Sequence, residues 1–431
     1  MYRKITAFLE AWKKNQYRKP LVLQGARQVG KTYSVLEFGR INYENVAYFN
    51  FETNPKLNRT FEENISPDYL IPILSHISGQ TIVKEKTLII FDEVQLCERA
   101  LTSLKYFCED APDYHIIVAG NLLGVAVNRA KFSFPVGKVD MKTMYPMDME
   151  EFMIAMGEEK LAAQVRQCFE TNTAMPSALH DAAMQLYRQY LVVGGMPECV
   201  LQFAQTRDYI LIRNTQDTIL VSYLNDMSKY NNLNEIKKTR LAYDNITVQL
   251  SKKNTRFQYK LIKKGGRASE FENAIEWLCL SGIVSQVYRI EQIKKPLENY
   301  RDIDAFKIYV SDLGLLCAKK DLAANDILYM AEELNDFKGG MAENYVNVQL
   351  SINGYHTYYW ESARGAEIDF VIQRNEQLIP IEVKSADNTR AKSLKVYMET
   401  YDPEYAIKLS AKNFAFEDNK KTVPLYAAFC I

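Results

Sequence analysis

Short, continuously apolar runs alternate with longer segments in the first third of the chain. Pro20–Gln24, Leu88–Phe91 and His115–Ala119 are runs of this kind, and each is followed by a turn-forming or polar residue. Unbroken apolar runs of this length are typical of strands buried on both faces of a parallel sheet. The segments between them, such as Arg99–Cys108, have the length of helices. The pattern predicts an α/β core with crossover helices over residues 1–148.

The spacing of apolar residues changes near residue 149. Phe152, Ala155 and Met156 recur at intervals of three and four, which is the period of an amphipathic helix. We therefore expect a mainly helical region over residues 149–254, interrupted by a sharp turn at Val193–Pro197, where two glycines and a proline occur together.

Two further domains are expected after the helical region. A helix at Phe271–Leu280 followed by strands at Ile283–Ile290 and Phe306–Val310 predicts a winged-helix domain over residues 255–334. Residues 335–431 are predicted to form a second α/β unit. Its elements are a helix at Met341–Ser351, strands at Tyr355–Trp360, Glu367–Gln373 and Leu378–Lys384, and a helix at Lys392–Tyr401.

Composition limits the class of protein. The 431 residues exceed what one core usually organises, and the 53 basic and 53 acidic residues balance, so any attraction to nucleic acid must be local. The seven cysteines form no CxxC pair and are read as reduced thiols. Met1–Lys19 lacks the pattern of a signal peptide, and Ile116–Val127 is too short to span a bilayer. We therefore expect a cytoplasmic protein without membrane contact.

A glycine-rich sequence follows the first apolar run. Residues 25–32 read GARQVGKT and match the Walker A pattern, in which glycines let backbone N–H groups wrap phosphates at the positive end of the next helix. Lys31 is expected to neutralise the β- and γ-phosphates and Thr32 to hold Mg²⁺. The predicted binding residues for ATP and Mg²⁺ are Gly25, Ala26, Arg27, Gln28, Val29, Gly30, Lys31 and Thr32.

The second apolar run ends in a pair of carboxylates, Asp92 and Glu93, at the edge of the predicted sheet where ligands bind in open α/β folds. Asp92 is expected to hold Mg²⁺ through water, and Glu93 to orient and activate the attacking water. Asn121, after the third run, is a candidate for sensing the γ-phosphate, with a turn-forming role as the alternative. The chain has no guanine-reading N-K-x-D motif, which favours ATP over GTP.

The chain resembles, over nearly its whole length, a family of bacterial and archaeal AAA+-type P-loop ATPases. The resemblance rests on GARQVGKT, LIIFDEVQ, a strand ending in AGN, FPVGKV with YPMDMEEF, LVVGGMPE, and FKIYVSDLGLLCA. It implies an ATPase core, a helical and winged-helix region, and commonly a C-terminal PD-(D/E)xK nuclease-like domain with a restriction-endonuclease-like fold. After AGN, relatives often carry an arginine where this chain has Lys138. Arg99, Arg129 and Lys138 all remain candidates for an arginine finger.

Carboxylates also gather in the last predicted domain. Asp369, Glu382 and Lys384 form the pattern D-x12-E-x-K on two neighbouring predicted strands, and Glu382 and Lys384 share one face. Asp369 and Glu382 can hold a second divalent metal, and Lys384 can help to activate water for phosphodiester attack. Glu343 matches the fourth acid of PD-(D/E)xK nucleases. A charge pattern without catalysis is the alternative, because inactive versions of that fold exist.

Residues 252–267 contain seven basic residues and no acid, which favours a local surface for DNA. The leading hypothesis is an enzyme in which ATP hydrolysis is coupled to DNA binding or processing. The alternative is a nucleotide-dependent switch, in which the ATP state controls docking of a protein partner or self-association, and the C-terminal domain is an inactive interaction platform. A small-molecule kinase is a weaker reading, because no acceptor site can be identified.

Overall fold

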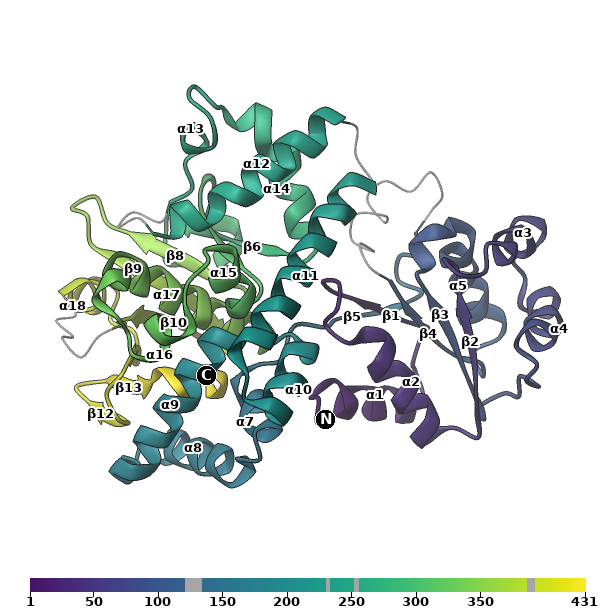
Figure 1. Ribbon diagram of the computed structural model, residues 1–431, viewed down its shortest axis with the longest axis horizontal. Helices are drawn as coiled ribbons and strands as arrows, with labels where there is room; N and C mark the ends of the chain where they lie inside the picture. Colours follow the sequence, from purple (N-terminus) through teal and green to yellow (C-terminus); the bar gives the residue numbers. More distant parts are fainter. Residues whose placement is uncertain (121–133, 230–232, 252–255, 386–391) are drawn as a thin grey trace. The chain divides into compact units, whose positions relative to one another are not determined.

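The computed structural model describes residues 1–120, 134–229, 233–251, 256–385 and 392–431. The chain divides into two compact units (Figure 1). The N-terminal unit comprises Tyr2–Tyr145 with the short segment Leu280–Gly282. The C-terminal unit comprises Met1, Pro146–Cys279 and Ile283–Ile431. Among the described residues, no helix combines the length and the apolar character that a membrane span requires.

A wholly parallel five-stranded sheet forms the centre of the N-terminal unit, in the order β2-β3-β4-β1-β5. All residues of β3 and β4 are buried, because helices cover both faces of a sheet of this kind. The three predicted apolar runs are β1, β3 and β4, so the parallel-sheet core is confirmed. The strands are β1 (Leu21–Gln24), β2 (Asn45–Asn50), β3 (Thr87–Asp92), β4 (His115–Ala119) and β5 (Asp140–Thr143).

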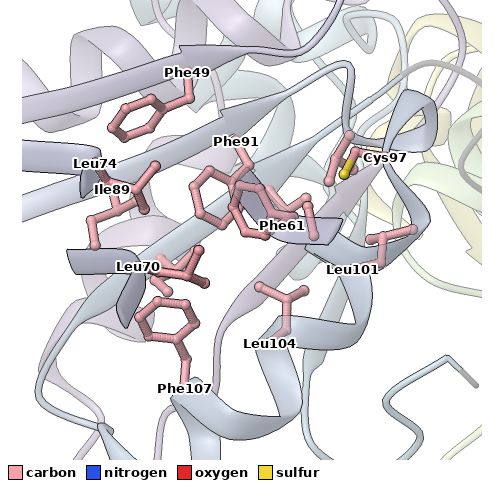
Figure 2. Packing of buried hydrophobic residues seen from close by; sticks show 14 of the residues in the cluster. Phe49, Phe61, Leu70, Leu74, Ile89, Phe91, Cys97, Leu101, Leu104 and Phe107 are labelled. Carbon is pink, nitrogen blue, oxygen red and sulfur yellow. The ribbon is translucent and has the colours of Figure 1, made fainter. Parts of the chain in front are cut away.

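Aromatic packing beneath β3 holds the end of this strand in place. Phe61 and Phe91 meet edge to face, with ring centroids 5.5 Å apart, within a larger buried cluster (Figure 2). Because successive strand side chains point to opposite faces, anchoring Phe91 in this cluster also sets the direction of Asp92. The helices of the unit are α1 (Ile5–Lys14), α2 (Lys31–Asn42), α3 (Lys56–Glu63), α4 (Pro67–Ser78), η1 (Val94–Leu96) and α5 (Glu98–Asp110).

The C-terminal unit begins with helices, as expected. These are α7 (Met149–Ala155), α8 (Glu159–Thr171), α9 (Ser177–Val193), α10 (Pro197–Thr206), α11 (Tyr209–Lys229) and α12 (Leu233–Leu250). The predicted turn after α9 is fastened by the buried carboxylate of Asp312. One oxygen accepts a hydrogen bond from Gly195 N at 2.6 Å, and the other accepts one from Leu315 N at 2.9 Å. A side chain at Gly194 would place its Cβ 2.3 Å from Asp312, so the turn needs glycine there.

An eight-stranded mixed sheet forms the rest of this unit, in the order β12-β13-β11-β10-β9-β8-β6-β7. The strands are β6 (Val284–Ile290), β7 (Arg301–Val310), β8 (Tyr358–Glu361), β9 (Glu367–Arg374), β10 (Gln377–Val383), β11 (Ala406–Ser410), β12 (Ala415–Glu417) and β13 (Lys420–Pro424). The helices are α13 (Tyr259–Ile262), α14 (Ala268–Leu280), η2 (Leu297–Tyr300), α15 (Leu313–Lys319), α16 (Ala324–Leu328), η3 (Glu332–Leu334), α17 (Asn335–Ile352), α18 (Lys392–Tyr401) and η4 (Leu425–Cys430).

The hairpin of β6 and β7 differs from the expected wing of a separate domain. Strand β6 pairs in parallel with β8, where Tyr288 lies opposite Tyr358, so the hairpin and the last strands form one sheet. An isolated hairpin is marginally stable, and β8 gives it a partner. The outer edge of β7 meets an amide: Val310 N donates to Asn344 Oδ1 at 2.7 Å, and Asn344 Nδ2 donates to Val310 O at 2.8 Å. The expected border at residue 335 therefore falls within one continuous structure.

Candidate functional site

The loop between β1 and α2 has the backbone geometry that phosphate binding requires. Gly25 and Gly30 both have positive φ, 144° and 91°, and a Cβ on Gly25 would lie 2.1 Å from Met144 O. Glycine is therefore required at this position. Helix α2 begins at Lys31, directly after the loop, so its free N–H groups and its positive dipole end face the same place. A group of phosphate oxygens fits this end of the helix.

Lys31 and Thr32, the first two residues of α2, contact the glycine loop and the end of β3 respectively. The buried amino group of Lys31 donates to the carbonyl oxygens of Gly25 at 2.9 Å and of Ala26 at 2.7 Å, within the curve of the loop. Thr32 Oγ1 donates to Asp92 Oδ2 at 3.0 Å. A hydroxyl and a carboxylate meeting in this way are hard oxygen ligands, which Mg²⁺ prefers. The residues present therefore fit a magnesium ion.

Strand β2 contributes two polar residues that the sequence analysis missed. Tyr48 donates from its hydroxyl to Asp92 Oδ2 at 2.7 Å, and Asn50 Nδ2 donates to the Tyr48 hydroxyl at 3.2 Å. Burial raises the pKa of Tyr48 to about 12, although the hydrogen bond from Asn50 acts against this, so the hydroxyl stays a donor at neutral pH. Tyr48 and Asn50 lie two positions apart on β2, so their side chains share one face of the strand, which ends at the sheet edge where Asp92 lies. This spacing is the sequence pattern from which the two residues could have been identified.

Glu93 sits in an uncommon backbone conformation directly after β3. Its φ is 51°, in the left-handed region, which costs a residue with a side chain about 1 kcal/mol or more. Its carboxylate accepts a hydrogen bond from Gln95 Nε2. Burial raises the pKa of Glu93, and the nearby charges of Asp92 and Glu52 add to this effect, while the bond from Gln95 opposes it. A carboxylate of raised pKa is a better proton acceptor.

Of the other residues predicted for this site, the γ-phosphate sensor and the three candidates for an arginine finger, only some lie within the described structure. Asn121 and Arg129 lie outside the described residues. Lys138 forms an ion pair with Glu109 at 2.8 Å, and Arg99 Nε donates to the carbonyl of Phe61 at 2.8 Å. Both of the described candidates for an arginine finger are therefore engaged within their own unit.

The second set of predicted residues lies on or beside the C-terminal sheet. Lys384 Nζ bonds Glu382 Oε1 at 2.8 Å, as their shared face predicts. Asp369 Oδ2, on β9, accepts a hydrogen bond from the backbone N–H of Val383 at 2.7 Å. Burial raises the pKa of Asp369 to about 7, and the charge of Glu343 on α17 adds to the rise. Within the described parts of the chain, no three His, Cys, Asp or Glu side chains are gathered so as to hold a metal ion.

A buried lysine lies among these carboxylates and was not singled out from the sequence. Lys307 on β7 is only 2% exposed, and its Nζ lies 3.3 Å from Glu343 Oε2 and forms a second ion pair with Glu367. The Tyr309 hydroxyl donates to the same Glu343 oxygen at 2.9 Å. Burial disfavours the charge of Lys307, but the surrounding acids, Glu343 foremost, outweigh it and hold the pKa of this lysine well above its ordinary value. Lys307 could have been identified from its position inside the apolar run FKIYV, because a lysine is rarely buried unless it is paired with an acid.

The basic run retains a solvent-exposed face. Its exposed members in the described structure are Arg256, Lys260, Lys263, Lys264 and Arg267. Lys263 pairs with Glu270 at 3.2 Å. Phe257 is buried and stacks on Phe306, so this aromatic ring supports the fold.

Several solved structures match the chain at low sequence identity. A Walker-type ATPase of Pyrococcus abyssi is 13% identical with a TM-score of 0.44, over 73% of this chain and 94% of that chain. The Aeropyrum pernix ORC2 protein is 11% identical with a TM-score of 0.38, over 79% and 95%. Thermotoga maritima RuvB is 12% identical with a TM-score of 0.30, over 65% and 87%. Likeness at this level carries no argument about function.

Family models divide the chain into three matched segments. Residues 184–326 match a domain of unknown function (DUF8612), and residues 338–428 match another (DUF4143). No curated protein matches the chain. Residues 17–153 match the model of an AAA domain, and this segment contains the glycine loop, Lys31, Thr32, Asp92 and Glu93. Residues 17–153 are therefore similar to an AAA domain, and the glycine loop lies within this segment.

Proposed function

We propose that the N-terminal unit binds ATP with Mg²⁺ and hydrolyses it. The observation that carries the proposal is the meeting of Thr32 and Asp92, 3.0 Å apart, beside a glycine loop whose fold requires Gly25. Two sequence-distant oxygen ligands and a phosphate-binding loop then converge on one place. This is the arrangement that phosphoryl transfer needs, because its catalysis depends on positioning and on neutralising charge.

Each side chain has a separate part in the proposed reaction. The loop N–H groups and Lys31 bind the phosphate oxygens, and Thr32 and Asp92 hold the magnesium ion, which supplies positive charge when bound. Glu93 accepts a proton from the water that attacks the γ-phosphorus, while the bond from this phosphorus to the β-phosphate oxygen breaks. Tyr48 keeps Asp92 in position through its hydrogen bond.

Phosphate release by the purified full-length chain tests this proposal. Lys31→Ala is expected to lower ATP turnover by about a hundredfold or more, because a charge aimed at the transferred phosphoryl group is lost. Lys384→Ala is the matched control, since it removes a partly buried lysine beside a carboxylate in the other unit and should leave turnover unchanged. Undiminished turnover in Lys31→Ala would overturn the proposal.

Different observations support two hypotheses for what the hydrolysis of ATP drives. The first, the nuclease reading, is that the chain binds and processes DNA, and the exposed basic residues around Lys260 favour contact with DNA phosphates. The ion pairs of Lys307 with Glu343 and Glu367 favour the switch, in which the C-terminal unit is a platform that does not cleave nucleic acid.

Nicking of supercoiled DNA in the presence of Mg²⁺ or Mn²⁺ separates the two readings. Under the nuclease reading, the wild-type chain nicks the DNA and Asp369→Ala does not. Under the switch reading, neither protein nicks the DNA beyond the background. Equal nicking by both proteins would identify a contaminating nuclease and count against the nuclease reading. Binding of the same DNA, compared between wild type and a Lys260→Glu variant, tests the basic surface independently.

A further inference from the structure

A small cavity lies in the C-terminal unit, beside the start of β10 and the end of α18. Its volume is about 260 Å³, which is below the roughly 300–1,000 Å³ of pockets that hold drug-sized ligands. None of its described lining residues is basic, and the lining includes three tyrosines and two acids, Tyr397, Tyr401, Tyr405, Glu376 and Glu404. The cavity therefore combines aromatic rings with negative charge, in a space that suits one small group.

The aromatic part of the lining is packed against Trp360 on β8. The indole ring stands perpendicular to the rings of Tyr397 and Tyr401, at centroid distances of 5.2 and 5.7 Å. Its Nε1 also donates to the Tyr401 hydroxyl at 3.2 Å, and the two tyrosine rings lie 4.9 Å apart. Aromatic faces attract cations, and the flat guanidinium group also stacks on them.

The hydroxyl of Tyr397 is a buried polar group that lacks a partner in the described structure. Tyr397 is 0% exposed, and its hydroxyl makes no hydrogen bond with the described residues. Buried hydroxyls are normally hydrogen-bonded, so an orphaned one in the lining of a cavity points to a polar group bound there. Burial raises the pKa of Tyr397, so its hydroxyl stays neutral and can both donate and accept.

The two acids of the cavity differ in their partners. Glu376 forms an ion pair with Lys295 at 2.9 Å, so this carboxylate already has a cation. Glu404 accepts a hydrogen bond from the side-chain amide of Gln377, and a neutral amide leaves the charge of the carboxylate in place. The nearby guanidinium of Arg374 is bonded to the third tyrosine of the cavity. Glu404 is therefore the carboxylate that a bound cation would meet.

We propose that this cavity binds a guanidinium group, carried by an arginine of a partner protein or by a free guanidine compound. A guanidinium has five N–H donors in one plane and no acceptor. When it stacks on a tyrosine ring, its N–H groups remain available for the Tyr397 oxygen and the Glu404 carboxylate, whereas an ammonium has no flat face to stack. The proposal does not depend on ATP hydrolysis, because every group that it uses lies in the C-terminal unit.

Calorimetric titration of the nucleotide-free, full-length chain tests the proposal. The probes are acetyl-arginine amide and acetyl-citrulline amide, which has a similar shape but no charge. We expect the citrulline probe to bind at least about tenfold more weakly, because its hydrogen bond to a carboxylate is not charge-assisted. Glu404→Gln should weaken binding of the arginine probe by about tenfold, and Tyr397→Phe by about fivefold.

The matched control is Glu399→Gln. Glu399 lies on the same helix, pairs with Lys395 at 3.7 Å on the surface, and does not line the cavity, so its replacement should leave binding unchanged. Three results would each overturn the proposal: no binding of the arginine probe, equal binding of the two probes, or equal affinity in Glu404→Gln and Glu399→Gln. If Tyr397→Phe does not fold, the comparison of the two glutamate variants still decides.

Free arginine, used as a third probe, distinguishes the two sources of the guanidinium group. Acetyl-arginine amide resembles an arginine within a protein, because its amino and carboxyl groups are blocked. Tighter binding of this blocked probe supports the proposal with a protein segment as the ligand, and tighter binding of free arginine supports it with a small compound as the ligand.

Discussion

The two units both place a lysine close to carboxylates, yet the two lysines have different partners. Lys31 begins a helix and donates to loop carbonyls, while Asp92 is bonded by the hydroxyls of Thr32 and Tyr48. Lys307 lies inside a strand and contacts carboxylates directly. Asp92 accepts hydrogen bonds from neutral donors, the two hydroxyls and the backbone N–H of Glu93, so its charge is still open to neutralisation by a metal ion. The charge of a carboxylate paired with a buried ammonium is already compensated. The pairing of the lysine, and not its proximity to acids, therefore distinguishes the two sites.

The largest expected effect concerns the stability of the C-terminal unit. Lys307→Ala removes the buried cation from two ion pairs and leaves two partly buried carboxylates, Glu343 and Glu367, without it, and we expect the free energy of unfolding to fall by about 3–5 kcal/mol. Urea denaturation in a Trp12→Phe background measures this, because the two remaining tryptophans, Trp277 and Trp360, both lie in the C-terminal unit.

The matched control for Lys307 is Lys295→Ala. Lys295 pairs with Glu376 at 2.9 Å, but this pair is on the surface and should contribute little. Similar urea midpoints for Lys307→Ala and the parent protein would show that the buried lysine does not stabilise the sheet. The proposed difference between the roles of Lys31 and Lys307 would then be wrong.

The next effect concerns the hydroxyl that meets Asp92. Thr32→Ala removes a ligand of the proposed magnesium ion, and turnover is expected to fall by about a hundredfold. Thr32→Ser keeps the hydroxyl and should retain most of the activity. Steady-state rates over a series of Mg²⁺ concentrations make the comparison, and an equal loss in both variants would assign the effect to packing of the threonine methyl group.

The pH dependence of hydrolysis should reveal Glu93. Because burial raises its pKa, this carboxylate takes up a proton at a higher pH than an exposed glutamate does as the solution is acidified. Its base form is then lost, and the rate should fall by about tenfold per pH unit below that raised pKa. The rate profile of the full-length chain measures this. An acid limb at or below the ordinary pKa of glutamate would argue against Glu93 as the base.

The smallest effect is expected at the hydrogen bond from Tyr48. Tyr48→Phe removes one donor to Asp92 and keeps the ring, which should cost about 1 kcal/mol, or about fivefold in turnover. Tyr33→Phe, which alters an exposed tyrosine of the same unit, is the control. A loss as large as that of Thr32→Ala would mean that Tyr48 takes part in the reaction directly.

Local motifs explain what could be predicted from the sequence. The phosphate-binding loop could be predicted because its residues are contiguous: the glycine loop follows a strand, and Lys31 and Thr32 begin the next helix. Buried strands such as β3 were predictable because parallel sheets impose continuous apolar runs.

Long-range pairing explains what could not be predicted. The sequence does not show which strand β8 pairs with. In the structure β8 pairs with β6, so the hairpin expected in a winged-helix domain is part of the larger C-terminal sheet. Lys307 meets Glu343 and Glu367 from separate elements, and no spacing rule relates these positions. Asn121 lies outside the described residues, so its expected role remains a prediction.

Glu93→Gln tests the central claim most directly, because it changes one proton-accepting group and almost no volume. ATP binding by calorimetry and single-turnover hydrolysis should be measured on the same preparation. We expect an affinity for ATP close to that of the wild type and a hydrolysis rate lower by about 10²–10⁴-fold. Hydrolysis at the wild-type rate in this variant would contradict the assignment of the ATPase site.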